Sequence, residues 1–237
     1  MRKKDFFIMK SKRALELCMG ILLIAGAFTL SREVVQVVAQ NRKAAKTIVV
    51  DAGHGGDDPG MVTDALREKD LNLEVAKKLK AYLEQTGYCV EMTRTDDNGL
   101  YEEGSRNQKV QDMQNRVAFI REKAPLLTVS IHQNSYPDSS VKGPQVFYYT
   151  DSMEGERLAN CIQSHMNKVL QIEHPREAKG NTTYYLLKKS PGILNIIECG
   201  FMTNPQESAL LQQPDYQEKI VEAIGEGIQE YLKLKDG

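Results

Sequence analysis

Hydrophobic and polar residues alternate along the chain in blocks that predict strands and helices in turn. Short apolar runs rich in β-branched residues predict strands at 47–50, 88–93, 126–131, 146–149, 184–187 and 193–197. Hydrophobic residues at helical spacing predict helices between Glu68 and Gly87 and at 110–123, 154–170 and 216–234. This order of elements favours an α/β fold: a three-layer sandwich with a central mixed, mostly parallel sheet flanked by helices.

The N-terminal segment has the pattern of an export signal, because several basic residues precede an uncharged apolar run at 17–30. The run is long for a signal peptide and short for a membrane span, so both cleavage at Val37-Val38-Ala39 and retention as a membrane anchor are open. The distance between run and cleavage site favours the anchor. A buried N-terminal helix is the alternative. We predict an apolar helix and tether within 1–46, and a folded domain at 47–237 outside the cytoplasm.

Charge and cysteine content exclude some functions. The chain has 31 basic and 32 acidic residues, so no broad positive field gathers nucleic acid. Of the four cysteines, Cys18 lies in the apolar run, and the remaining three cannot all pair. With no CxxC spacing among them, we predict small hydrophobic side chains rather than disulfides or a cysteine metal cluster.

Four side chains able to bind a metal or move a proton stand at the ends of predicted elements. His54, His132 and Glu198 follow three strands, and Glu68 begins the first helix after the glycine-rich loop. Strand ends of one sheet edge lie together, so these groups are expected to converge. Two histidines and one carboxylate match a catalytic zinc site, and the other carboxylate is then free for proton transfer in amide hydrolysis. Taken singly, a histidine at a strand end is more often a structural side chain.

Two residues beside the histidines are candidates to orient the rings. Asp51 and Ser130 stand close to His54 and His132 in sequence and offer oxygen acceptors. Asp51 can equally cap the glycine-rich loop, so both interpretations stay open.

The sequence resembles the zinc-dependent N-acetylmuramoyl-L-alanine amidases of the amidase-3 family over residues 47–234. The resemblance rests on VDAGHGG at 50–56, EK at 68–69 with NL at 72–73, SIHQN at 130–134, and IECGF at 197–201 with TN at 203–204. It implies Zn²⁺ held by His54, Glu68 and His132, with Glu198 as the catalytic glutamate. The implied reaction is hydrolysis of the amide between the lactyl group of muramic acid and the L-alanine of the peptidoglycan stem peptide. Ala52 and Cys199 depart from the family's commoner residues without removing a ligand.

Within this family, the chain is similar to the germination-specific amidases of spore formers. The single apolar N-terminal segment, the loop at 102–104 and the ending at 210–216 carry this resemblance. It implies peptide removal in the spore cortex before muramic-δ-lactam formation, possession of a regulatory protein partner, and a location such as the forespore intermembrane space. The N-terminal segment would be the contact with the membrane.

Further polar residues are candidates for substrate contact. Asn134 and Asn204 follow strand-end motifs, where their amides can bond a peptide or lactyl carbonyl. Arg94 and Arg116 either meet stem-peptide carboxylates or are solvated surface charges. His165 and His174 have no partners at ligand spacing and are left out of the site.

Two other functions compete with the amidase. One is a wall-binding or partner-dependent module on the same scaffold, which the presence of all four reactive residues disfavours. The other is a different zinc peptidase, which the absence of an HExxH helix disfavours.

Overall fold

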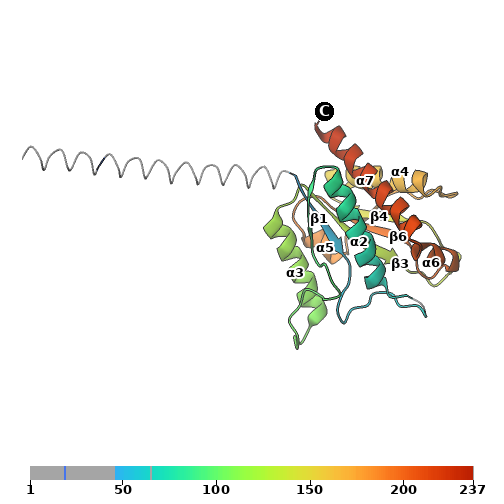
Figure 1. Cartoon of the computed structure of the whole chain (residues 1–237), viewed down its shortest axis with the longest axis horizontal. Helices are drawn as coiled ribbons and strands as arrows, with labels where there is room; N and C mark the ends of the chain where they lie inside the picture. Colours follow the sequence, from blue (N-terminus) through green and yellow to red (C-terminus); the bar gives the residue numbers. More distant parts are fainter. Residues whose placement is uncertain (1–18, 20–45, 65, 237) are drawn as a thin grey trace, which may run out of the picture. The chain divides into compact units, whose positions relative to one another are not determined.

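A six-stranded sheet forms the centre of the structure, a computed structural model that describes residues 19, 46–64 and 66–236 (Figure 1). The strand order is β2-β1-β3-β6-β4-β5. The strands are β1 (Thr47–Ala52), β2 (Cys89–Met92), β3 (Leu127–Asn134), β4 (Gln145–Tyr149), β5 (Lys179–Asn181) and β6 (Leu194–Phe201). β2, β1, β3 and β6 are parallel, whereas β4 runs antiparallel to β6 and parallel to β5. The predicted mixed, mostly parallel sheet is confirmed.

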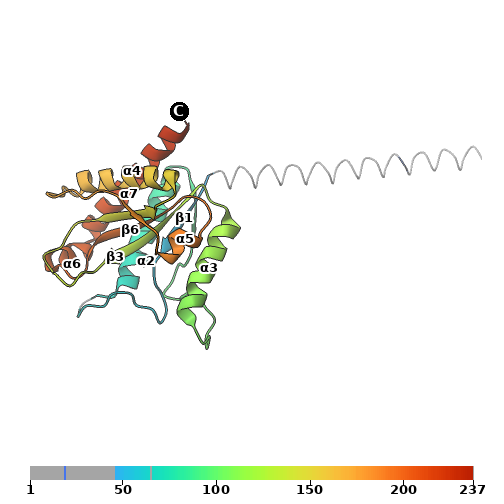
Figure 2. The same cartoon turned by 180° about the vertical axis from the view of Figure 1, so that it is seen from behind.

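Helices cover both faces of this sheet (Figures 1 and 2). One face carries α2 (Glu68–Gln85), α4 (Met153–Val169) and α7 (Pro214–Asp236), with α6 (Pro205–Leu211) beside α7. The other face carries α3 (Gln108–Lys123) and α5 (Tyr185–Lys189). Alternate residues of β1 show the division: Ile48 and Val50 belong to the core under α2 and α7, and Val49 to the core under α3 and α5. The predicted three layers are therefore present.

Local sequence explains where several helices begin and end. Asn107 and Ser152 cap α3 and α4, because their side-chain oxygens accept hydrogen bonds from the amides of Val110 and Gly155. α2 ends just before Gly87, which has a left-handed φ of 92° and suits the position after a helix, as the sequence predicts.

The structure corrects one predicted strand and adds two elements. Residues 184–187 are predicted as a strand, but α5 begins at Tyr185. Neighbouring Leu186 and Leu187 both pack into the same core, which a helix allows and an alternating strand does not. β5 was not predicted because its sequence, KGN, holds no hydrophobic residue, and α6 is too short for a periodic pattern.

The predicted apolar helix at 17–30 lies outside the described residues apart from Met19, and the boundary at residue 46 stays a prediction. Among the helices of the described residues, none has the length and apolar character needed to cross a membrane. Cys89, Cys161 and Cys199 are free thiols in the structure.

The close crossing of α4 and α7 depends on a glycine. A Cβ added at Gly227 would lie 2.6 Å from the Cα of Ile162, which is backbone and cannot rotate away. We expect Gly227→Ala to lower the free energy of unfolding by about 1–3 kcal/mol, because overpacking outweighs the better helix propensity of alanine. Urea unfolding followed by circular dichroism measures this change. Glu222→Ala, at an exposed position of the same helix, is the control and should stay within about 0.5 kcal/mol of wild type. Equal midpoints for both variants would contradict the packing argument.

Candidate metal centre and active site

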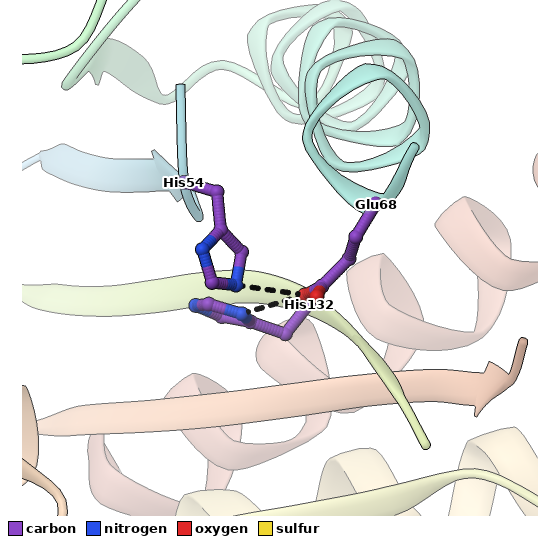
Figure 3. A group of neighbouring side chains, drawn as sticks. All are labelled: His54, Glu68 and His132. Atoms are coloured by element: carbon purple, nitrogen blue, oxygen red, sulfur yellow. Dashed lines mark hydrogen bonds and ion pairs between the residues drawn. The ribbon is translucent and has the colours of Figure 1, made fainter. Parts of the chain in front are cut away.

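Three side chains from three separate elements meet at the carboxyl edge of the sheet (Figure 3). His54 follows β1, Glu68 is the first residue of α2, and His132 lies in β3. His54 Nε2 is 3.2 Å and His132 Nδ1 is 3.0 Å from Glu68 Oε1. One ligand atom from each residue lies within 4.8 Å of the others, so the three residues form a possible donor set for a divalent cation.

Glu68 is held in place by donors from the surrounding backbone and side chains. The amides of Met61 and Gln133 donate to its two carboxylate oxygens at 2.9 and 3.1 Å, and Asn72 Nδ2 donates at 3.2 Å. Burial opposes its charge, but hydrogen bonds from His132 and His54 hold the pKa of Glu68 well below its usual range. The carboxylate is therefore ionised and rigidly aimed, as a metal ligand must be.

Asp58 orients the ring of His54 through a hydrogen bond of 2.9 Å between Nδ1 and Oδ2. Burial lowers the pKa of His54, but the hydrogen bonds with Asp58 and Glu68 outweigh this effect and raise the pKa to about 9. To hold a metal ion, His54 would have to be neutral, so binding of the metal would release the proton that this raised pKa retains. Sequence reasoning missed Asp58, although an aspartate four residues after His54 was a usable signal.

The residues predicted to orient the rings are bonded elsewhere. Ser130 Oγ donates to Asp51 Oδ2 at 2.5 Å, and Thr93 Oγ1 donates to Asp51 Oδ1 at 2.7 Å. Arg116 Nη1 donates to the same Oδ1 at 2.6 Å. Burial raises the pKa of Asp51, but Arg116 and the two hydroxyls lower it to about 2. Of the two open interpretations, neither describes these bonds: Asp51 and Ser130 bond each other rather than a histidine ring, and Asp51 anchors a buried ion pair with Arg116.

This ion pair supports the turn that presents His54. Arg116 also donates to the carbonyl oxygens of Ala52 and His54, at 2.8 and 2.6 Å. His54 has a φ of 61°, an uncommon conformation for a residue with a side chain. Arg94 donates to the carbonyl oxygens of Ala52 and Gly53 at 2.9 and 3.0 Å. Both arginines are buried, so neither is a solvated surface charge and neither is free to meet a substrate carboxylate.

Two glycines leave room for the side chains of His54, Glu68 and His132. A Cβ at Gly53 would lie 2.3 Å from Cε1 and Nε2 of His132. A Cβ at Gly60 would lie 2.4 Å from Glu68 Oε2 and 2.7 Å from Cδ2 of His54. Any other residue at these positions would displace a ring or the carboxylate.

Glu198 is paired in register with His132 across β3 and β6, which places it beside the possible donor set. Its Oε2 is buried and has no hydrogen-bond partner among the described residues. Burial raises the pKa of Glu198 to about 7, against the opposing effect of His132. A carboxyl group with this pKa accepts and releases a proton near neutral pH. The adjacent Cys199 is buried, and burial raises the pKa of its thiol, which favours the neutral form.

A cavity of about 280 Å³ opens onto these groups. His54, His132 and Glu198 line it together with side chains from α3 and from the start of α5: Lys109, Asp112, Met113, Arg116, Tyr184, Tyr185 and Leu186. This arrangement places reactive groups against a space that admits a small part of a substrate.

The two predicted substrate asparagines are engaged with neighbouring backbone. Asn134 Oδ1 accepts from the amide of Ser135 at 2.8 Å. Asn204 is buried and caps α6, because its Oδ1 accepts from the amides of Gln206 and Glu207. Their contact with substrate stays a prediction. His165, left out of the site, lies between two glutamates of α7.

Comparisons with known proteins find a matching family, similar sequences and similar structures. The sequence model of a family described as N-acetylmuramoyl-L-alanine amidase matches residues 48–230. The germination-specific N-acetylmuramoyl-L-alanine amidase of Bacillus subtilis is 40% identical over 195 residues, or 80% of this chain and 81% of that protein. The CwlD amidase of Clostridioides difficile, solved in complex with the GerS lipoprotein, has a TM-score of 0.77 and 39% identity, covering 80% of this chain and 99% of that one. An N-acetylmuramoyl-L-alanine amidase of Clostridium difficile 630 has a TM-score of 0.71 and 30% identity, covering 81% and 99%.

The buried ion pair yields a stability prediction. We expect Asp51→Asn to lower the free energy of unfolding by about 3 kcal/mol at pH 7, because it leaves the Arg116 charge buried without its partner. The pKa of Asp51 is about 2 in the folded protein against 3.8 ordinarily. Its ionised form therefore stabilises the fold above about pH 4, and this contribution is lost as the pH falls towards 2.

Chemical denaturation at several pH values tests this prediction. The difference between wild type and Asp51→Asn should be full at pH 7 and shrink below about pH 4. Asp151→Asn makes the same chemical change at an exposed position and should cost less than about 0.5 kcal/mol. A difference that stays constant down to pH 2 would show that the ion pair does not carry the effect.

Proposed function

The chain belongs to the N-acetylmuramoyl-L-alanine amidase family, and on this premise we propose that it hydrolyses the amide between the lactyl group of muramic acid and L-alanine in peptidoglycan. The observation that carries the proposal is the meeting of His54, Glu68 and His132 beside Glu198 at one cavity. Two imidazoles and a carboxylate for a metal, with a second carboxyl group alongside, are the parts that amide hydrolysis requires.

We propose that His54, Glu68 and His132 hold Zn²⁺. The donor set has the nitrogen and oxygen character that zinc prefers, and three protein ligands leave one position open. Gly53 and Gly60 have no Cβ that would push His132, Glu68 or His54 apart, so the three side chains can stay close enough to share one metal ion. When bound, zinc supplies Lewis-acid chemistry, polarising the amide carbonyl and making water a better nucleophile.

Glu198 is proposed to move the proton of the reaction. Its unpartnered Oε2 faces no competing donor in the described part of the chain, and its pKa of about 7 suits both acceptance and release. In the proposed sequence, Glu198 takes a proton from the attacking water and delivers it to the nitrogen of the departing alanine. Glu68 cannot share this role, because its oxygens are occupied by backbone amides and both histidines.

The setting of the reaction is proposed to be the spore cortex, outside the cytoplasm, ahead of muramic-δ-lactam formation and in germination. The 40% identity with the germination-specific amidase of Bacillus subtilis supports this assignment. A regulatory protein partner is proposed because a similar amidase was solved with a lipoprotein bound. Contact with the membrane through the segment at 17–30 is part of the same proposal.

The proposed role of Glu198 predicts the effect of one substitution. We expect Glu198→Gln to lower release of stem peptides about a thousandfold, because the amide cannot accept the proton, while zinc content stays unchanged. Mass spectrometry of peptidoglycan digested with zinc-loaded protein measures free peptides that begin with L-alanine. Glu218→Gln, at an exposed position of α7, should digest at the wild-type rate.

Two results would contradict the proposal in different ways. Undiminished peptide release by Glu198→Gln would remove this residue from the mechanism. Zinc-loaded wild type that binds peptidoglycan and releases no peptide would favour a wall-binding module on this scaffold.

Asp58 supplies a second test, on metal affinity. We expect Asp58→Ala to weaken zinc binding about 10–100-fold, because the His54 ring loses the acceptor that orients it. Competition with a chromogenic chelator measures the affinity. Asp57→Ala removes the neighbouring, exposed carboxylate and should leave the affinity within about twofold of wild type. Equal losses in the two variants would point to loop charge in general rather than to the hydrogen bond.

A further inference from the structure

The wall of the cavity formed by α3 carries a lysine that the reaction described above does not use. We propose that Lys109 binds a stem-peptide carboxylate close to the scissile amide, so that the site prefers stems in which this carboxylate is free. The proposal rests on the proposed amidase function and names a specificity residue for it. A peptidoglycan stem offers such a group, because the glutamate that follows the alanine is joined through its side chain and keeps a free α-carboxylate.

Lys109 lies on the one face of α3 that the cavity exposes. Asp112, Met113 and Arg116 also line the cavity, three, four and seven residues after Lys109. Positions with this spacing form one stripe along a helix. Arg116 bonds that stripe to the carbonyl oxygens of Ala52 and His54, so α3 is tied to the same turn that presents a ligand histidine. The backbone of Lys109 is therefore held at a fixed position relative to the reactive groups.

Of the lysine and arginine side chains that line the cavity among the described residues, only Lys109 keeps donors for a substrate. Arg116 is buried and donates to Asp51, to Asp112 and to two backbone carbonyls. The Lys109 side chain is 75% exposed, and its Nζ lies 3.7 Å from Asp58 Oδ2. An exposed pair at this distance contributes little, and Asp58 already accepts from His54 at 2.9 Å. The ammonium group is thus able to turn towards an arriving anion.

Because the other charged groups of the cavity include several carboxylates, binding of an anionic ligand depends on the positive charge of Lys109. Asp58 and Glu198 line the same space, and Glu68 lies within 3.2 Å of its two histidines. The two positive charges of the proposed Zn²⁺ are balanced by Asp58 and Glu68, so a carboxylate entering beside Glu198 is repelled unless a further positive charge compensates. Lys109 supplies that charge, and an amidated stem, which has no charge at this position, gains nothing from it.

Binding measurements separate this proposal from the proposed function. Full-length protein carrying Glu198→Gln and loaded with zinc is titrated by calorimetry with two N-acetylmuramoyl tripeptides, one with a free and one with an amidated α-carboxylate on the second residue. With Lys109 present, the protein should bind the tripeptide with the free carboxylate more tightly than the amidated one. Adding Lys109→Gln should weaken its binding about tenfold and leave the amidated ligand within about twofold. Lys109→Arg should restore the preference, because it keeps the charge.

A matched control and a metal readout complete the design. Lys77→Gln removes the same charge from an exposed position of α2 and should change neither affinity. Zinc affinity, measured by chelator competition, should be the same with and without Lys109→Gln. Equal weakening for both tripeptides, no weakening for either, or a parallel fall in zinc affinity would overturn the proposal. Failure of the proposed function is seen separately, as absent peptide release by the zinc-loaded wild-type protein, while the binding titrations still decide the role of Lys109.

Discussion

The buried ion pair between Asp51 and Arg116 is the interaction on which the site depends. Arg116 reaches from α3 to the end of β1, where it bonds the Asp51 carboxylate and the carbonyl oxygens of Ala52 and His54. These bonds hold His54 at a φ of 61°, a conformation that costs a side-chain-bearing residue about 1 kcal/mol or more. The bonds offset that cost, and the ring then points at Glu68 rather than along the strand.

Two carboxyl groups near one another acquire opposite properties from their surroundings. Glu68 accepts hydrogen bonds from two backbone amides and two histidines. These bonds favour its ionised form and keep its pKa low. Glu198 has a buried oxygen without a partner, and burial raises its pKa to about 7. The difference suits a ligand and a proton carrier in the same small space. It arises from hydrogen bonding and solvation, since the two side chains are chemically identical.

The residues that sequence reasoning misjudged are those whose partners are distant in the chain. Arg94 and Arg116 were expected to meet solvent or substrate, and both are buried against the carbonyl oxygens of the turn around His54. Ser130 was a candidate to orient a histidine ring, and it bonds Asp51 on the neighbouring strand instead. Asp58 is the exception, because it lies only four residues after His54 and was overlooked although it forms the hydrogen bond that orients the ring. The local sequence around a long side chain does not predict a distant hydrogen-bond partner, because that partner depends on how the elements pack.

The sequence alone determined the layered α/β fold and the four reactive positions. Alternation of apolar strands and periodic helices specifies burial faces, and residues just after parallel strands lie at one edge of the sheet. Only the tertiary structure decided which groups orient the four reactive side chains, which of these side chains are ionised, and which keep an oxygen without a hydrogen-bond partner. That choice depends on contacts of α3 with the end of β1 and with the turn at 54–58, and α3 is far from both in sequence and has no periodic signature for such contacts. The strand predicted at 184–187 shows the same limit, because its hydrophobic residues fit either a strand or the helix that packing selected.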